Sequence, residues 1–150
     1  MSEFAVRPVP GDDIVDLRLA LLRGLASGDD GFWSGDDQRD TLHVGGYRDG
    51  ALVGFATIVR QRAPGITEPN AWQITEIAVD HGHRGYGLGG QMLRRCLEHA
   101  AARNARIAWC RIPAGAYGFF QHFGFQRRGQ PFEDPAGGPR YLMAAAFATN

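Results

Sequence analysis

The chain contains no lysine, because all 16 of its basic residues are arginine. This absence excludes a P-loop for nucleoside triphosphates, which needs a lysine to reach the phosphates. The 16 acidic residues balance the arginines, so the formal net charge is zero. A protein that binds nucleic acid through counterion release would carry a basic excess. We therefore expect no nucleic-acid partner.

Cysteine and long hydrophobic runs are also scarce. The two cysteines, Cys96 and Cys110, are not spaced as a metal-binding pair, and we expect reduced thiols in a cytoplasmic protein without a metal. The longest apolar run, Tyr141–Ala148, is too short to span a bilayer, so we expect no membrane partner. The 150 residues contain no repeat and no long linker, which predicts a single domain over residues 1–150.

Glycine is concentrated in the most informative segment, which reads Arg84, Gly85, Tyr86, Gly87, Leu88, Gly89 and Gly90. The segment follows the apolar residues Ile77–Val79 and precedes a helical pattern that starts at Gln91. A strand, a glycine-rich turn and a helix start direct free backbone N–H groups at one point, where the helix dipole adds positive charge. Glycine permits the sharp turn and a close approach to the ligand. The segment therefore predicts a phosphate or pyrophosphate site.

Two ligand classes fit these glycines. Residues 85–90 match Gly-x-Gly-x-x-Gly, the dinucleotide fingerprint, and residues 84–89 match Arg-x-x-Gly-x-Gly. The dinucleotide fingerprint requires an acidic residue about 20 positions later to bind the ribose. The next expected strand, Arg106–Ile112, contains no Asp or Glu, which argues against a dinucleotide-binding oxidoreductase.

Hydrophobic periodicity and turn residues predict a mixed α/β chain. Strands are expected at 4–9, 41–48, 51–62, 71–79, 106–112, 125–130 and 140–148, and helices from Asp12 or Asp13 to Leu25, at 89–104 and at 113–123. The order β-α-β-β-β-α-β-α-β-β is neither the strict alternation of a doubly wound sheet nor an all-β pattern. The segment Ser27–Asp40, rich in aspartate, is interpreted either as a solvated loop or as a lid with Phe32 and Trp33 as apolar contacts.

The chain resembles the GCN5-related N-acetyltransferase (GNAT) superfamily over nearly its whole length. Three blocks carry the resemblance: Ile77–Gly89, the aromatic block Phe119–Phe125 and the hairpin Gly50–Gly54. The Arg-x-x-Gly-x-Gly spacing is similar to the family's pyrophosphate loop, and the end of the chain is similar to small bacterial members of unassigned substrate. The resemblance implies a central, mostly antiparallel sheet that is splayed between its fourth and fifth strands and has helices on both faces.

The same resemblance implies an N-acetyltransferase that moves the acetyl group of acetyl-CoA directly to a primary amine of a small molecule or peptide. The residues implied to bind acetyl-CoA are Ile77, Ala78, Val79, Arg84, Gly85, Tyr86, Gly87, Leu88, Gly89, Gly90 and Phe120. The loop would bind the pyrophosphate, the strand would pair with the pantetheine arm, and the Val79 N–H would face the thioester oxygen. The resemblance is compatible with a homodimer, and a non-catalytic acyl-CoA sensor stays open as an alternative.

The chain departs from the family where a tyrosine usually protonates the leaving thiolate. That position is Phe120, which has no hydroxyl, and Arg111 replaces the usual asparagine after the preceding strand. Tyr117 lies three residues before Phe120 and shares its helix face, so it is the candidate general acid. Packing of Tyr117 alone and protonation by solvent are the alternatives.

Glu76 is the candidate general base, because burial in the cleft would raise its pKa. Strict alternation in the strand puts Glu76 on the same face as Trp72 and Ile74, so a β-bulge would be needed to turn it toward the cleft. His43 is expected to be a hydrogen-bonded core residue. Cys110 could carry an acetyl group as a nucleophile, although a buried structural thiol is the simpler interpretation.

Overall fold

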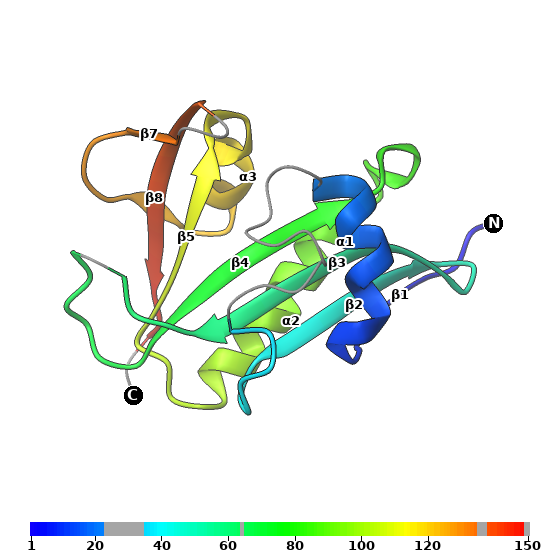
Figure 1. The fold of residues 1–150 in the computed structure, drawn as a ribbon, viewed down its shortest axis with the longest axis horizontal. Coiled ribbons are helices and arrows are strands. Elements are labelled where there is room, and N and C mark those ends of the chain that lie inside the picture. Colours follow the sequence, from blue (N-terminus) through cyan, green and yellow to red (C-terminus); the bar gives the residue numbers. More distant parts are fainter. Residues whose placement is uncertain (23–34, 64, 135–137, 149–150) are drawn as a thin grey trace.

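The computed structural model describes residues 1–22, 35–63, 65–134 and 138–148 (Figure 1). Its strands are β1 (Phe4–Pro8), β2 (Leu42–Arg48), β3 (Ala51–Arg60), β4 (Ala71–Val79), β5 (Ile107–Pro113), β6 (Gln126–Arg127), β7 (Phe132–Asp134) and β8 (Gly138–Ala146). Its α-helices are α1 (Val15–Leu22), α2 (Leu88–Ala101) and α3 (Tyr117–His122), and short 3-10 turns precede each of them. Within the described ranges, no helix is long and apolar enough to cross a membrane.

The predicted element order is confirmed except near the C-terminus. The strand expected at 125–130 shortens to β6, and β7 forms where no strand was predicted. β7 is only three residues long and pairs with the start of β8, with Phe132 opposite Arg140. A segment this short has too few residues to display an alternating pattern, so its sequence gave no strand signal.

One sheet carries the fold, with the strand order β1-β2-β3-β4-β5-β8-β6 and β7 paired with β8. All pairs are antiparallel except β4 with β5, which is parallel and joins only Ala71–Gln73 to Ile107–Trp109. Beyond these residues the two strands diverge, and α3 lies at the open end (Figure 1). The predicted splay between the fourth and fifth strands is therefore confirmed.

Helices α1 and α2 lie on opposite faces of this sheet (Figure 1). The apolar side of α2, including Met92, Leu93 and Cys96, packs into the main core with Trp72 and other sheet residues. Gly54 on β3 allows this close approach, because a Cβ there would lie 3.1 Å from the Met92 methyl carbon and 2.9 Å from a backbone oxygen. The strand and the helix that flank the glycine-rich segment are thereby fixed against each other.

A β-bulge in β4 decides where Glu76 points. Thr57 on β3 is opposite Glu76, whereas the next residue, Ile58, is opposite Ile74, so Thr75 is the extra residue. Trp72 and Ile74 remain in the core beside α2. Glu76 instead contacts α1, on the opposite face of the sheet. The bulge therefore places the Glu76 side chain on the face opposite to Trp72 and Ile74, which strict alternation would not do. A catalytic role for Glu76 would require such a reorientation.

Candidate active site

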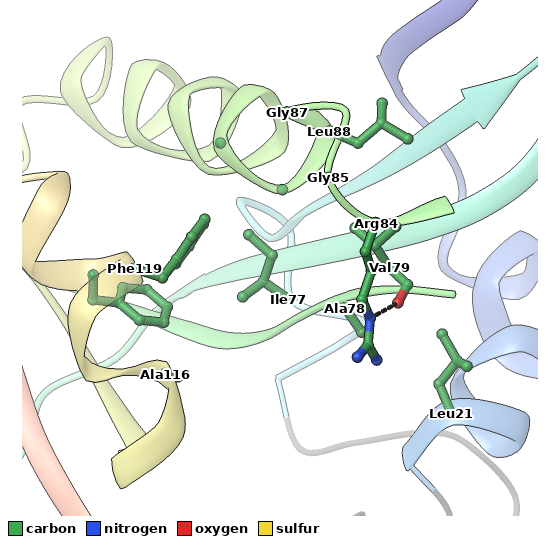
Figure 2. A pocket seen from close by; sticks show the side chains of 13 residues that line it. Leu21, Ile77, Ala78, Val79, Arg84, Gly85, Gly87, Leu88, Ala116 and Phe119 are labelled. Atoms are coloured by element: carbon green, nitrogen blue, oxygen red, sulfur yellow. Dashed lines mark hydrogen bonds between the residues drawn. The ribbon is translucent and has the colours of Figure 1, made fainter. Parts of the chain in front are cut away.

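The glycine-rich loop joins the end of β4 to the start of α2. Gly85 and Gly87 have φ values of +89° and +84°, and a Cβ on either would meet no atom within 4 Å. Glycine is therefore required by the left-handed backbone conformation and not by crowding. Gly87 is the N-cap of α2, so the first free N–H groups of the helix open onto the loop. Arg84 Nε donates a 2.9 Å hydrogen bond to the Val79 carbonyl, which ties the loop to β4 (Figure 2).

A cavity of about 540 Å³, here named the glycine-loop cavity, lies between this loop, β4 and α3. Its lining comprises Leu21, Ile77, Ala78, Val79, Arg84, Gly85, Gly87, Leu88, Gly89, Gly90, Ala116, Phe119 and Phe120. The side chains of Ile77 and Phe119 extend into this space from β4 and α3 (Figure 2). All the predicted coenzyme-binding residues except Tyr86 therefore line one cavity. Tyr86 is exposed and stacks on Phe4, with ring centroids 5.1 Å apart.

The edge of β4 in this cavity offers backbone groups to a ligand. The Asp80 N–H donates to the Val53 carbonyl on β3 at 2.8 Å. Because backbone groups alternate between the two sides of a strand, the N–H groups of Val79 and Ile77 point away from β3. On that side β5 pairs with β4 only as far as Gln73. The strand therefore presents the N–H groups of Ile77 and Val79 to any extended ligand that would bind in the glycine-loop cavity.

Two further glycines have a packing role that the sequence analysis missed. A Cβ on Gly90 would lie 2.7 Å from the Phe123 ring, and one on Gly89 would lie 3.5 Å from Phe119. Both rings belong to the aromatic block around α3, so the small residues at the start of α2 let the two helices approach. Gly90 lines the cavity and also shapes its wall.

A second cavity of about 280 Å³, here named the splay cavity, opens where β4 and β5 diverge. Its lining comprises Ile74, Thr75, Glu76, Ile77, Cys110, Arg111, Ile112, Pro113, Ala116, Phe120 and Arg140. It shares Ile77, Ala116 and Phe120 with the glycine-loop cavity. A donor in one cavity and an acceptor in the other would therefore meet at this common wall.

Glu76 is held in the wall of the splay cavity by a buried arginine. Arg18 on α1 donates from Nε to Glu76 Oε1 at 2.9 Å and from its second terminal nitrogen to Oε2. The same guanidinium group also pairs with Asp36, at 2.5 Å. Burial raises the pKa of Glu76 to about 7 and outweighs the opposing effect of Arg18. A carboxylate with this pKa can exchange protons near neutral pH.

Other sequence predictions meet different outcomes. Tyr117 packs edge-on against Tyr141, with centroids 5.3 Å apart, and is not among the residues that line either cavity. His43 is a hydrogen-bonded core residue as expected, with Nδ1 2.8 Å from the Thr57 hydroxyl. Cys110 lines the splay cavity, but burial raises the pKa of its thiol, so the reactive thiolate is disfavoured. The lid residues Phe32 and Trp33 lie outside the described residues.

The sequence analysis did not find Arg18 or Asp36. Arg18 did leave a signal, because it lies four residues after Ile14 and three before Leu21 and so interrupts the apolar stripe of α1. A charged residue in such a stripe requires a buried partner. Asp36 gave no comparable signal, because its segment contains several aspartates and no periodic pattern.

Comparisons with known proteins identify relatives of this chain in sequence and in fold. The sequence model of the acetyltransferase (GNAT) family matches residues 20–125. The uncharacterized N-acetyltransferase YitI of Bacillus subtilis (strain 168) is 23% identical over 97% of this chain and 97% of its own length. Streptothricin acetyltransferase of Streptomyces lavendulae is 32% identical over 73% of this chain, which spans 54% of that enzyme. A solved aminoglycoside 6'-N-acetyltransferase complexed with coenzyme A is 16% identical, with a TM-score of 0.74 over 97% of this chain and 98% of that one.

Proposed function

The chain belongs to the acetyltransferase (GNAT) family and is an acyltransferase, and we propose that it moves the acetyl group of acetyl-CoA to a primary amine within one ternary complex. The observation that carries this proposal is the meeting of two cavities at Ile77, Ala116 and Phe120. The thioester would enter through the glycine-loop cavity and the amine through the splay cavity. The acceptor is a small molecule or a peptide N-terminus.

The donor would be bound mainly by backbone groups. The N–H groups of the loop and of the first turn of α2 would bind the pyrophosphate, as free donors at a helix start do. The outward N–H groups of Ile77 and Val79 would bond the pantetheine arm and the thioester oxygen. A donor aimed at a developing oxyanion is typically worth about 10²–10³ in rate. The exposed ring of Tyr86 lies at the loop itself and is proposed to contact the coenzyme there.

Glu76 is proposed as the group that accepts the proton of the attacking amine. It lines the splay cavity next to Ile77, which belongs to both cavities. Although Arg18 donates to both of its oxygens, a carboxylate oxygen has a second lone pair, so each can still accept a proton. The pKa of about 7 matches a base that works near neutral pH. The N–H proton leaves as the nitrogen–carbon bond forms, and the carbon–sulfur bond then breaks to release the coenzyme thiolate.

Protonation of that thiolate is proposed to come from solvent. Phe120 lies on the common wall of the two cavities and has no hydroxyl. Tyr117 packs against Tyr141 and is not among the residues that line either cavity. Its role as the general acid therefore stays a prediction. A thiolate is a good leaving group and needs less assistance than an alkoxide.

Release of coenzyme A from acetyl-CoA in the presence of a broad amine panel tests the proposal. Mass spectrometry of the mixture must identify an N-acetylated product in equal amount to the released thiol. Tight acetyl-CoA binding without turnover of any amine would instead support the non-catalytic sensor, which the absence of a hydroxyl at Phe120 favours. Binding of NADH in preference to acetyl-CoA would overturn both.

A further inference from the structure

Two arginines line the splay cavity and have no part in the proton transfer proposed above. Arg111 lies on β5 and Arg140 on β8. Within the described part of the chain, the other ionisable groups in this lining are Glu76 and the Cys110 thiol. The cavity wall therefore holds two permanent positive charges and one carboxylate.

Strand register brings the two arginines together. Arg111 is opposite Leu142, and Arg140 is opposite Pro113. Arg111 and Arg140 are thus diagonal neighbours on one face of the β5–β8 pair. Diagonal positions are about 7–8 Å apart, within reach of long side chains. Two guanidinium groups so placed can both donate hydrogen bonds to one carboxylate, with the planar fork that suits this anion.

Glu76 already has a charged hydrogen-bond donor from outside the lining of this cavity. Arg18 donates to both of its oxygens from α1, so Glu76 does not depend on the arginines of the cavity for a partner. The Arg111 side chain is exposed, with its guanidinium 5.3 Å from the centre of the Trp109 ring. Among the residues that the structure describes, Arg111 forms no ion pair. Its charge is therefore available to a ligand.

We propose that the splay cavity selects a small primary amine that carries a carboxylate, in the manner of an amino acid. The proposal rests on the proposed function and names its acceptor class. Arg111 and Arg140 would bind the carboxylate, and the amine would face Glu76 and the common wall at Ile77. A volume of about 280 Å³ suits a ligand of this size. A polycationic amine would be repelled by the same two arginines.

The test compares amino acids and ω-amino acids with their matched carboxamides, at saturating acetyl-CoA and with the full chain. A carboxamide lowers the pKa of the neighbouring α-amine, so intrinsic reactivity alone would favour the amide. We expect the opposite, with kcat/KM for at least one acid tenfold or more above that of its amide. Spermidine and O-phosphoethanolamine complete the panel, the latter to separate carboxylate recognition from recognition of any anion.

Variants then assign the effect to residues. Arg111→Gln and Arg140→Gln should each raise the KM for the preferred acid tenfold or more, remove the preference over the amide, and leave the acetyl-CoA Kd unchanged. Arg106→Gln is the matched control, because Arg106 is exposed beside β5 but lines neither cavity. Circular dichroism must show that each variant is folded, and Arg111→Lys should recover part of the preference if charge is the cause.

The outcomes separate this inference from the proposed function. If no amine at all releases coenzyme A, the proposed function fails. If amides or spermidine react as well as the acids, the function stands and the selection of a carboxylate is wrong. A preference for O-phosphoethanolamine alone, or turnover confined to peptides, also overturns the assignment of an amino-acid-like acceptor.

Discussion

Arg18 and Glu76 are 58 positions apart in the chain and form a two-point hydrogen-bonded pair in the interior, with side chains that are each 1% exposed. The pair joins α1 to β4 at the splay cavity. Desolvation works against the charge on both groups, and a buried pair of this kind stabilises a fold less than its geometry suggests. Its value here is positional, because it fixes the orientation of a carboxylate that lines the cavity.

Arg18→Met should destabilise the fold strongly. The variant leaves Glu76 and Asp36 buried without their shared partner, and breaking a buried pair in this way costs about 3–5 kcal/mol. Urea unfolding measures the loss, and Glu76→Gln in the same chain should recover part of it. Arg128→Met is the matched control, since it breaks the partly exposed pair with Glu68 and should cost no more than about 1 kcal/mol. Equal losses in the two variants would contradict the assignment.

The second prediction concerns the dependence of rate on pH. Because the pKa of Glu76 is raised to about 7, kcat/KM should rise with pH through a limb near that value. Glu76→Gln should lower kcat by about 10²-fold, within the range for general base catalysis, and remove the limb. Its acetyl-CoA Kd should stay unchanged, because Glu76 does not line the glycine-loop cavity. An unchanged limb in Glu76→Gln would assign it to the amine instead.

Stability gives an independent measurement of the same pKa. A carboxyl whose pKa rises from 4.5 to about 7 on folding binds its proton more tightly in the folded state. The contribution of Glu76 to folding stability is therefore most favourable at a pH below its pKa in the unfolded state. This contribution is lost as the pH rises through its pKa in the folded state. The free energy of unfolding of the wild type, measured relative to that of Glu76→Gln, should therefore decrease as the pH is raised from 4.5 to about 7. If the difference in the free energy of unfolding between the two proteins does not change with pH, the pKa of Glu76 is not raised in the folded state.

Gly87→Val should abolish acetyl-CoA binding in a folded protein. Gly87 has a left-handed φ of +84° at the start of α2, and a valine would force the loop to change conformation. Gly65→Val is the control, because Gly65 has a φ of +82° and equally open surroundings but lines neither cavity. Both variants should lose similar stability, whereas calorimetric titration should show a loss of affinity in Gly87→Val alone. Wild-type affinity there would refute the phosphate-loop assignment.

The glycine-loop cavity could be predicted from sequence because most of its lining comes from one segment of the chain. The glycines, the preceding strand and the helix start are contiguous, so spacing alone places them around one point. The splay cavity and the arginine that contacts its Glu76 are assembled from residues far apart in the chain, as Arg18 and Arg140 illustrate, and no spacing rule joins them. Alternation along β4 gave the wrong face for Glu76, because the bulge depends on pairing with β3 and not on the sequence of β4 alone.

Tyr117→Phe should leave kcat and the acetyl-CoA Kd within about twofold of wild type, because the half-buried Tyr117 packs against Tyr141 and lines neither cavity. Steady-state kinetics in water and in deuterium oxide measure the change. Phe120→Tyr places a hydroxyl on the common wall and is the informative counterpart. A fall of tenfold or more in Tyr117→Phe would restore this residue as the general acid.

The last prediction is that no covalent acetyl-enzyme forms during turnover. The chain has no lysine to be acetylated, and its sulfur nucleophiles are the two cysteines. Both are buried, and burial raises the pKa of the Cys96 thiol to about 12 and also raises the pKa of the Cys110 thiol, so neither supplies a thiolate near neutral pH. Intact mass measurement after incubation with acetyl-CoA should therefore show the unmodified chain, and Cys110→Ala should retain turnover. A stoichiometric adduct that disappears on adding amine, and that is absent in Cys110→Ala, would replace direct transfer with a two-step mechanism.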